Sequence, residues 1–465
     1  MINGCEGCLH KQRKIDELTE ENQRLKAKLG YLKRKEHQGY FGSSTPSSKV
    51  PVKANTAEEN QGKRGGAKPG HRGHGRNGFV EADAPRVVAV ESELGDHCPQ
   101  CGGPLENKGT RSHSVIDIPA VKAERVVYRL AKQYCPHCKR SFQASPPGVL
   151  PKSLYSNQLM ATAATMHYLH GIPMGRICEQ IGISVGPLIG IFHRLARTFA
   201  CVPDRLIEQY RQAPVKHADE TSWRNDGRSG YAWLFATVRI SIFLFRNTRS
   251  SSVVREVLGT KALPGTLVVD RYVGYNKVPC ALQYCYSHLL RDVEELQKGF
   301  PNDGEVEAFV STMAPLMGVA MGLRSLKISD AQFYEQAKDV KSQITDLVQS
   351  PAQHLGIRRI QEIFHENAHR LYHWAEDRRI PPDNNLAERD LRPTVIARKV
   401  SFGSQSDAGA HSRGVLMTVL HTLRKSTTTD PCSALKAALD KIAKKPTLDP
   451  FDLLFPPDPP PRSPP

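Results

Sequence analysis

The chain has 465 residues, which is too long for one ordinary hydrophobic core, so we expect several structural units. Its net charge of +17 predicts a polyanionic partner, either nucleic acid or an anionic membrane surface. We find no run of about 18 apolar residues and no secretory signal, which argues against a membrane span and against export. The expected location is therefore the reducing cytoplasm, with nucleic acid as partner and the eleven cysteines as thiols or metal ligands.

Residues 11–38 predict a coiled coil. Apolar residues recur at alternating spacings of three and four between Ile15 and Leu32, and Asn22 occupies one of the core positions. A buried asparagine there favours a parallel dimer, because each copy can hydrogen-bond its twin. The repeat is short, so a helix packed on its own chain remains the alternative.

Residues 39–90 are rich in Gly, Pro and Ser and predict a flexible basic linker. Its basic tract contains Lys63, Arg64, Lys68, Arg72 and Arg76. The first 80 residues hold 16 Lys and Arg against 8 Asp and Glu, so this arm carries +8 of the +17. We expect the arm to lie along DNA phosphates, where counterion release favours each neutralised contact; a solvated tail is the alternative.

Residues 91–145 contain two Cys-Pro-x-Cys pairs, which are Cys98 with Cys101 and Cys135 with Cys138. Four thiolates in two such knuckles predict a tetrahedral zinc site. The Gly-Gly pair at 102–103 allows a sharp turn around the metal, and strands are expected at 115–118 and 125–130. These features together predict a zinc ribbon-like module.

Residues 154–205 have helical periodicity. The segments 174–181 and 185–195 flank Gly182, which can take the positive φ of a helix-turn-helix. One interpretation is a helical DNA-binding region, and the other is an ordinary helical pair.

Residues 212–412 predict a domain built on a mixed sheet. Alternation from Val215 to Asp219 indicates a first strand, and strands follow at 230–239, 240–246, 266–269 and 278–286, with a helix at 251–258. Asp219 is expected at the end of the first strand and Asp270 at the end of the fourth. Two carboxylates at neighbouring strand ends suit the binding of divalent ions for phosphodiester cleavage.

The rest of the chain is predicted to be mainly helical. Residues 291–380 are expected to form a helical insertion within the 212–412 domain. Residues 413–465 are expected to form C-terminal helices, amphipathic near 414–425 and 432–444, and a disordered Pro-rich tail.

Glu388 is the candidate for a third carboxylate, and its helix permits two interpretations. Glu388 either joins Asp219 and Asp270, or completes a capping box in which Asn385 is the N-cap. Arg392 lies four residues on, where it could meet a phosphate or pair with Glu388, whereas Asp390 faces away.

These segments together resemble the transposases of the insertion sequence sixty-six family. The matching segments run in family order and comprise the zipper-like start, Phe41-Gly42-Ser43-Ser44, Lys68-Pro69-Gly70-His71-x-Gly73-His74, the Cys-Pro-x-Cys pairs, His217-Ala218-Asp219-Glu220-Thr221, Asp270-x-Tyr272-x-Gly274-Tyr275, Cys285-x2-His288 and Asn384-Asn385-x-Ala387-Glu388-Arg389-x-Leu391-Arg392-Pro393. The resemblance implies a ribonuclease-H-like catalytic core in which Asp219, Asp270 and Glu388 bind Mg²⁺ or Mn²⁺. It further implies that Cys285 and His288 are an accessory pair, to which the spacing adds Arg392.

The expected protein is therefore a multidomain α+β DNA transposase of a bacterial insertion sequence. It would cut at terminal inverted repeats and join the freed 3′-OH to target DNA, using Mg²⁺ or Mn²⁺ for chemistry and Zn²⁺ for structure. Arg389, Arg398 and Lys399 are further candidates for DNA contacts. Expected partners are DNA, a second copy or higher oligomer and accessory proteins of the same element, at the nucleoid and without a membrane. The alternatives are a catalytically inactive zinc-containing DNA-binding regulator and a nuclease without strand joining.

Overall fold

The computed structural model describes residues 97–106 and 123–456, together with residues 14, 18, 19, 21, 22, 82 and 87–89. They belong to two compact units, one made of Met1–Pro51 with Ala123–Pro465 and the other of Val52–Lys122. Residues 14, 18, 19, 21 and 22 are helical. The rest of the expected coiled coil, the tract from Lys63 to Arg76, the expected strand at 115–118 and the tail after residue 456 lie outside the described residues.

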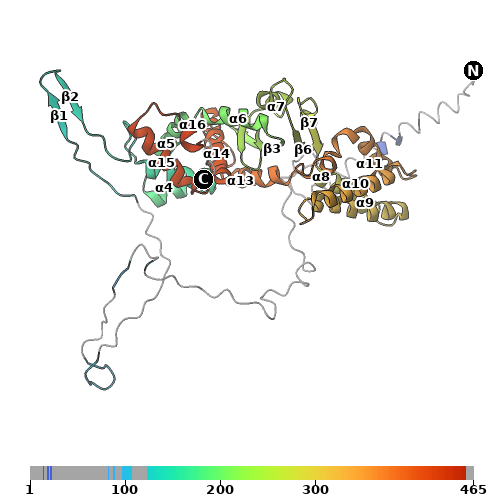
Figure 1. Ribbon diagram of the computed structural model, residues 1–465, viewed down its shortest axis with the longest axis horizontal. Coiled ribbons are helices and arrows are strands. Elements are labelled where there is room, and N and C mark those ends of the chain that lie inside the picture. Colours follow the sequence, from blue (N-terminus) through green and yellow to red (C-terminus); the bar gives the residue numbers. More distant parts are fainter. Residues whose placement is uncertain are drawn as a thin grey trace, which may run out of the picture. The chain divides into compact units, whose positions relative to one another are not determined.

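A five-stranded mixed sheet forms the centre of the larger unit, with the order β5-β4-β3-β6-β7 (Figure 1). Strands β3 (Val215–Asn225), β4 (Arg228–Ala236) and β5 (Ser241–Arg246) are antiparallel. Strand β6 (Thr266–Val269) runs parallel to β3 after the helix α7 (Ser251–Leu258), and β7 (Ala281–Tyr284) runs parallel to β6. The structure is therefore mixed α/β, and the expectation of a mixed sheet is confirmed.

Strand β3 is longer than the sequence predicted. Asp226 and Gly227 have φ of 49° and 71° and form the two-residue turn between β3 and β4, in which Asn225 pairs with Arg228. The polar residues Ser222, Arg224 and Asn225, which suggested a strand end, remain paired with β4. Asp219 consequently lies within β3 rather than at its end.

Two long helices cover one face of this sheet. Helix α13 (Asn385–Ser401) packs on β3 and β4, and α14 (Asp407–Ser426) packs on β5. Residues 412–423 of α14 are all buried, so α14 is a central core helix and not the amphipathic surface helix expected near 414–425. The expected boundary at residue 412 falls inside α14.

The helices that precede the sheet pack on the other side of α14. They are α3 (Asn157–Ala164) with the π-helical turn η3 (Thr165–Leu169), α4 (Met174–Ile181), α5 (Val185–Thr198) and α6 (Val202–Gln212). Helices α5, α6 and η3 contact α14, so the 154–205 region shares a core with the sheet. After α14 the chain forms α15 (Pro431–Lys444) and α16 (Pro450–Leu454).

A group of helices lies between β7 and α13 in the sequence and stays together in Figure 1. It contains α8 (Tyr286–Gly299), α9 (Gly304–Leu323), α10 (Asp330–Gln349), α11 (Leu355–Glu366), the 3₁₀ turn η5 (Ala368–Arg370) and α12 (His373–Glu376). By length and composition α9 could cross a membrane, contrary to the expectation from the sequence. Its seven buried residues and its contacts with α8 and α10 equally fit a core helix, so this is weak evidence for a span.

The first prediction concerns Asp390, whose carboxylate accepts a hydrogen bond from the Ser241 hydroxyl at 2.9 Å and forms an ion pair with Lys425. The side chains of Asp390 and Lys425 are only 10% and 15% exposed. Asp390→Ala would leave a buried ammonium without its countercharge, so we expect the free energy of unfolding to fall by about 3–5 kcal/mol in urea titrations.

Glu362→Ala is the control, because Glu362 pairs with Arg359 at 3.1 Å where both side chains are more than half exposed. This change should alter the free energy of unfolding by less than about 0.5 kcal/mol. Equal effects of the two substitutions would show that burial adds nothing to the contribution of the Asp390–Lys425 pair.

Candidate active site

The register of β3 and β6 brings two aspartates to the same level of the sheet. Val215 pairs with Thr266 and His217 with Val268, and continuing this register by two residues places Asp219 opposite Asp270. Asp270 directly follows the last residue of β6. The expected juxtaposition of the two carboxylates thus arises from parallel pairing, although only Asp270 lies at a strand end.

Both aspartates lie where a negative charge is unfavourable. Burial raises the pKa of Asp219 well above its usual value, and the nearby charges of Glu220, Asp270 and Glu388 raise it further. Burial also raises the pKa of Asp270, whose Oδ1 accepts the Tyr272 N–H at 3.0 Å. Asp219 Oδ1 accepts the Glu220 N–H at 2.8 Å, while its buried Oδ2 has no hydrogen-bond partner among the described residues.

Glu388 does not belong to a capping box. The N-cap of α13 is Asn384 rather than Asn385, and the Asn384 side chain makes no capping hydrogen bond. The Asp383 carboxylate instead accepts the Asn385 N–H at 3.0 Å. Glu388 is therefore the fourth residue of the helix, and the capping interpretation of this residue is wrong.

The Glu388 carboxylate lies beside the first turn of α8. One ligand atom each from Cys285, His288 and Glu388 lie within 4.8 Å of one another, so this group could hold a metal ion. Burial raises the pKa of Cys285 to about 12, and burial together with Arg291 and Arg271 lowers that of His288 to about 3. His288 Nδ1 and Glu388 Oε1 are buried without hydrogen-bond partners among the described residues, although Arg291 approaches Glu388 to 4.0 Å.

Asn384 joins the three elements that carry these residues. Its side-chain N–H donates to the Ala218 carbonyl at 2.8 Å, and its Oδ1 lies 3.0 Å from Nδ1 of His217. Burial lowers the pKa of His217 to about 4, so the neutral ring donates from Nδ1 to Asn384. The Asn384 backbone N–H lies 3.2 Å from Sγ of Cys285. Asn384 thereby fixes α13 to β3 and to the start of α8, and no local sequence pattern indicates this role.

Glu220 is a buried acid that sequence reasoning did not place, although strand alternation sends it to the opposite face from Asp219. Its carboxylate forms an ion pair with Arg249 at 2.6 Å and accepts a hydrogen bond from the Tyr275 hydroxyl at 2.6 Å. The Arg249 guanidinium also stacks 4.0 Å above the ring of Tyr272. Burial and Asp270 raise the pKa of Glu220 to about 7 against the opposing effects of Arg249 and Tyr275.

The basic residues predicted on α13 have different surroundings. Arg392, Arg389 and Lys399 are exposed, and within the described chain Arg392 makes no ion pair with Glu388. Arg398 instead points inward and donates to Thr221 Oγ1 at 2.9 Å and to the Ser222 carbonyl at 2.8 Å. Nη1 of its guanidinium thus holds α13 on β3, and a contact between Arg398 and a phosphate stays a prediction.

The helix-turn-helix candidate has the expected turn, but the exposed side chains at the start of its second helix cannot hydrogen-bond base edges. Gly182 has φ of 68° between α4 and α5. The exposed residues in the first two turns of α5 are Val185, Gly186, Pro187, Ile189 and Gly190. None of these side chains can hydrogen-bond a base edge, which is what the N-terminal part of a recognition helix does. Recognition of DNA bases by α5 stays a prediction.

Each cysteine knuckle has the local geometry of a metal ligand pair. At the first knuckle, backbone N–H groups of Gln100 and Cys101 lower the pKa of the Cys98 thiol, and Gly102 follows with φ of 70°. At the second, N–H groups of Cys138 and His137 lower the pKa of Cys135, and Lys139 follows with φ of 51°. The second knuckle joins β1 (Lys132–Cys135) to β2 (Arg140–Gln143), and these two strands pair in antiparallel fashion. The strand expected at 125–130 therefore lies at 132–135, where β2 is available as its partner.

Comparison with known proteins identifies the family. A family model described as Transposase IS66 family matches residues 152–412, more than half of the chain, and a zinc-finger binding domain of transposase IS66 matches residues 96–139. The chain therefore belongs to the IS66 transposase family and contains its zinc-finger domain, which confirms the resemblance seen in the sequence.

Two relatives come from Sinorhizobium fredii (strain NBRC 101917 / NGR234). Uncharacterized protein y4jD is 23% identical over 507 aligned positions, which cover 95% of this chain and 96% of the relative. Uncharacterized protein y4qI is 24% identical over 423 positions, which cover 82% of this chain and 76% of the relative. The likeness thus extends over nearly the whole length of the first relative.

The second prediction tests Asn384. Asn384→Ala would leave the Nδ1–H of His217 and the carbonyl of Ala218 buried without partners, and each such loss costs about 1–3 kcal/mol. We expect its free energy of unfolding to fall by at least about 2 kcal/mol in urea titrations. Asn385→Ala, at the exposed neighbouring position, should change it by less than about 0.5 kcal/mol. A wild-type stability for Asn384→Ala would remove Asn384 from this role.

The third prediction concerns zinc. Elemental analysis of the purified protein should give one zinc per chain, because the two knuckles supply four thiolates. Cys98→Ser and Cys135→Ser should each lose the metal, whereas the exposed Cys201, outside both knuckles, should tolerate serine without loss. Unchanged zinc in both knuckle variants would refute the assignment.

Proposed function

We propose that this protein is an active DNA transposase that cleaves the ends of its element and joins the freed 3′-OH to target DNA. The observation that supports this best is the set of three acids, Asp219, Asp270 and Glu388, whose charges influence one another inside a family-typical domain. Burying like charges together raises the free energy of the folded protein, and a bound cation would relieve that cost. The sheet order, with Asp219 and Asp270 on adjacent parallel strands, supports a ribonuclease-H-like core.

The acids fit divalent ions such as Mg²⁺ or Mn²⁺. These ions prefer carboxylate oxygens, and both Asp219 Oδ2 and Glu388 Oε1 are buried oxygens without a hydrogen-bond partner among the described residues. Unpaired buried oxygens of this kind are expected where an ion binds. When bound, the ions would polarise the phosphoryl oxygens and activate the attacking oxygen.

The chain's own groups would position the DNA strand around these acids. The rigid sheet and α13 would keep the carboxylates in place, so little reorganisation would accompany reaction. Arg291, at 4.0 Å from Glu388 and 40% exposed, could offer its guanidinium to a phosphate oxygen. Cys285 and His288 would serve as the accessory pair beside Glu388.

Other parts of the chain would hold the DNA and assemble the complex. We assign phosphate contacts to Arg389, Arg398 and Lys399 and to the tract from Lys63 to Arg76. The coiled coil at 11–38 would make a homodimer or higher oligomer, and the zinc module and the 154–205 helices would bind element ends. Such a protein would work in the bacterial cytoplasm at the nucleoid, with accessory proteins of the same element.

The two other candidate functions differ from this one in measurable ways. An inactive DNA-binding regulator would have no use for three clustered acids in mutual repulsion, and a pure nuclease would cut without joining. Incubating the protein with labelled element ends, plasmid target and Mg²⁺ or Mn²⁺ separates them. Binding alone indicates the regulator, cleavage alone the nuclease, and joined products the transposase.

The fourth prediction concerns the three acids. Asp219→Asn, Asp270→Asn and Glu388→Gln should each reduce cleavage and joining by at least about 100-fold, as removal of one charge-stabilising group commonly does. Loss of like-charge repulsion should leave the melting temperature in EDTA equal or higher. The wild-type protein should gain thermal stability from Mn²⁺, and the three variants should gain less.

Glu295→Gln is the matched control, because Glu295 is an exposed acid on α8, the helix that begins beside Glu388. It should keep both activity and the Mn²⁺ response. Asp390 is unsuitable as a control because it is engaged with Lys425. Full activity in any of the three acid variants would refute that residue's assignment.

A further inference from the structure

A large cavity opens beside the start of α13. Its volume is about 1350 Å³, which exceeds the usual 300–1,000 Å³ of small-ligand pockets. Its walls come from α6, the segment 213–217 at the start of β3, the β4–β5 turn at 237–240, the end of α9, the segment 379–383, the first turns of α13, the end of α14 with the residues that follow it, and the end of α16. Segments that are far apart in the sequence of the larger unit therefore form it.

The charges around this cavity are strongly unbalanced. Four arginines line it, Arg239, Arg324, Arg379 and Arg389, against the single acid Asp383. Arg379 is already neutralised by a two-pronged pair with Asp377, and the Asp383 carboxylate caps the Asn385 N–H. The other three arginines are exposed and form no ion pair with any described residue.

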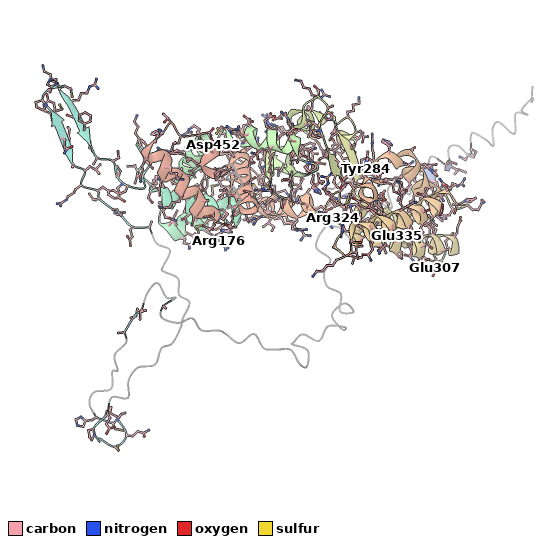
Figure 2. All side chains as sticks on the ribbon, viewed as in Figure 1. Arg176, Tyr284, Glu307, Arg324, Glu335 and Asp452 are labelled. Atoms are coloured by element: carbon pink, nitrogen blue, oxygen red, sulfur yellow. The ribbon has the colours of Figure 1, made fainter. Side chains whose placement is uncertain are left out.

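Three unpaired guanidiniums thus converge from three different elements, since Arg239 comes from the β4–β5 turn, Arg324 from the end of α9 and Arg389 from α13. Arg324 is labelled in Figure 2. A cleft lined by one sign of charge concentrates ligands of the opposite sign.

We propose that this cavity, the arginine cleft, binds a nucleic-acid strand through its phosphates. The other polar groups in the walls are mainly hydroxyls, from Ser325, Ser426 and Thr427–Thr429 among others, which suit phosphate oxygens. The only large aromatic ring in the lining is Phe455, so the described walls offer no stacking platform for successive bases. Recognition is accordingly of the backbone and independent of base sequence.

The position of the cleft connects it to the proposed active site. His217 lies in its wall two residues before Asp219 on the same face of β3, and Arg389 follows Glu388 on α13. A strand whose phosphates occupy the cleft would continue towards the three acids. This inference rests on the proposed function for its biological meaning, but binding to the cleft can be measured without any catalysis.

The fifth prediction is a binding experiment on the full chain in buffer without Mg²⁺ or Mn²⁺, so that cleavage dependent on these ions does not occur. Fluorescence anisotropy of labelled random-sequence oligonucleotides, one single-stranded and one duplex, gives the slope of log K against log salt concentration. Arg239→Gln with Arg324→Gln removes two phosphate contacts, so the slope should become shallower by about 1.4 for single strands or about 1.8 for duplex. Whichever form shows the change is the form that the cleft binds.

The control is Arg358→Gln with Arg359→Gln, which removes the same charge from the exposed surface of α11, outside the cleft. This variant should keep the wild-type slope with both oligonucleotides. Equal slopes for the cleft variant, the control and the wild-type protein would overturn the proposal. Failure of the proposed function would instead appear as an absence of joined products from the wild-type protein with Mg²⁺ or Mn²⁺, so the two failures are distinguishable.

Discussion

The buried hydrogen bonds of Asn384 are the interaction on which the candidate site depends most. One side chain satisfies the Ala218 carbonyl and the ring of His217, while its backbone N–H meets Cys285. All these groups are buried, so an unpaired partner would cost the full desolvation free energy of a polar group. The start of α13 therefore has one favourable position on β3, and that position brings Glu388 towards Asp219.

The sheet supplies the second constraint, because parallel pairing of β3 with β6 fixes the relative level of Asp219 and Asp270. Folding brings these carboxylates together against their repulsion, and hydrophobic burial elsewhere in the unit must offset that cost. On the opposite face of the sheet, the buried acid Glu220 has two partners, the guanidinium of Arg249 and the hydroxyl of Tyr275. Among the described residues, Asp219 Oδ2 and Glu388 Oε1 lack such partners, which distinguishes these acids from an acid whose role is to hold the fold together.

Much of this arrangement could be predicted from local sequence patterns. The helix α7 and the strand β6 have the predicted bounds, since short apolar runs and amphipathic periodicity depend only on neighbouring residues. Features that depend on distant partners were missed. The full length of β3 requires β4 across the Asp226-Gly227 turn, and the burial of α14 requires β5 on one side and helices on the other. The position of Asn384 at the start of α13 depends on its hydrogen bond to β3. Arg398 looked like a surface cation because nothing in the sequence shows that Thr221 and Ser222 lie beside it.

The central claim is that Asp219, Asp270 and Glu388 together hold catalytic divalent ions. Anomalous X-ray scattering from crystals of the protein grown with Mn²⁺ would locate those ions directly. The account predicts a manganese peak within bonding distance of carboxylate oxygens from all three residues. A peak bound only to Cys285, His288 and Glu388, or no peak near the two aspartates at saturating Mn²⁺, would contradict it.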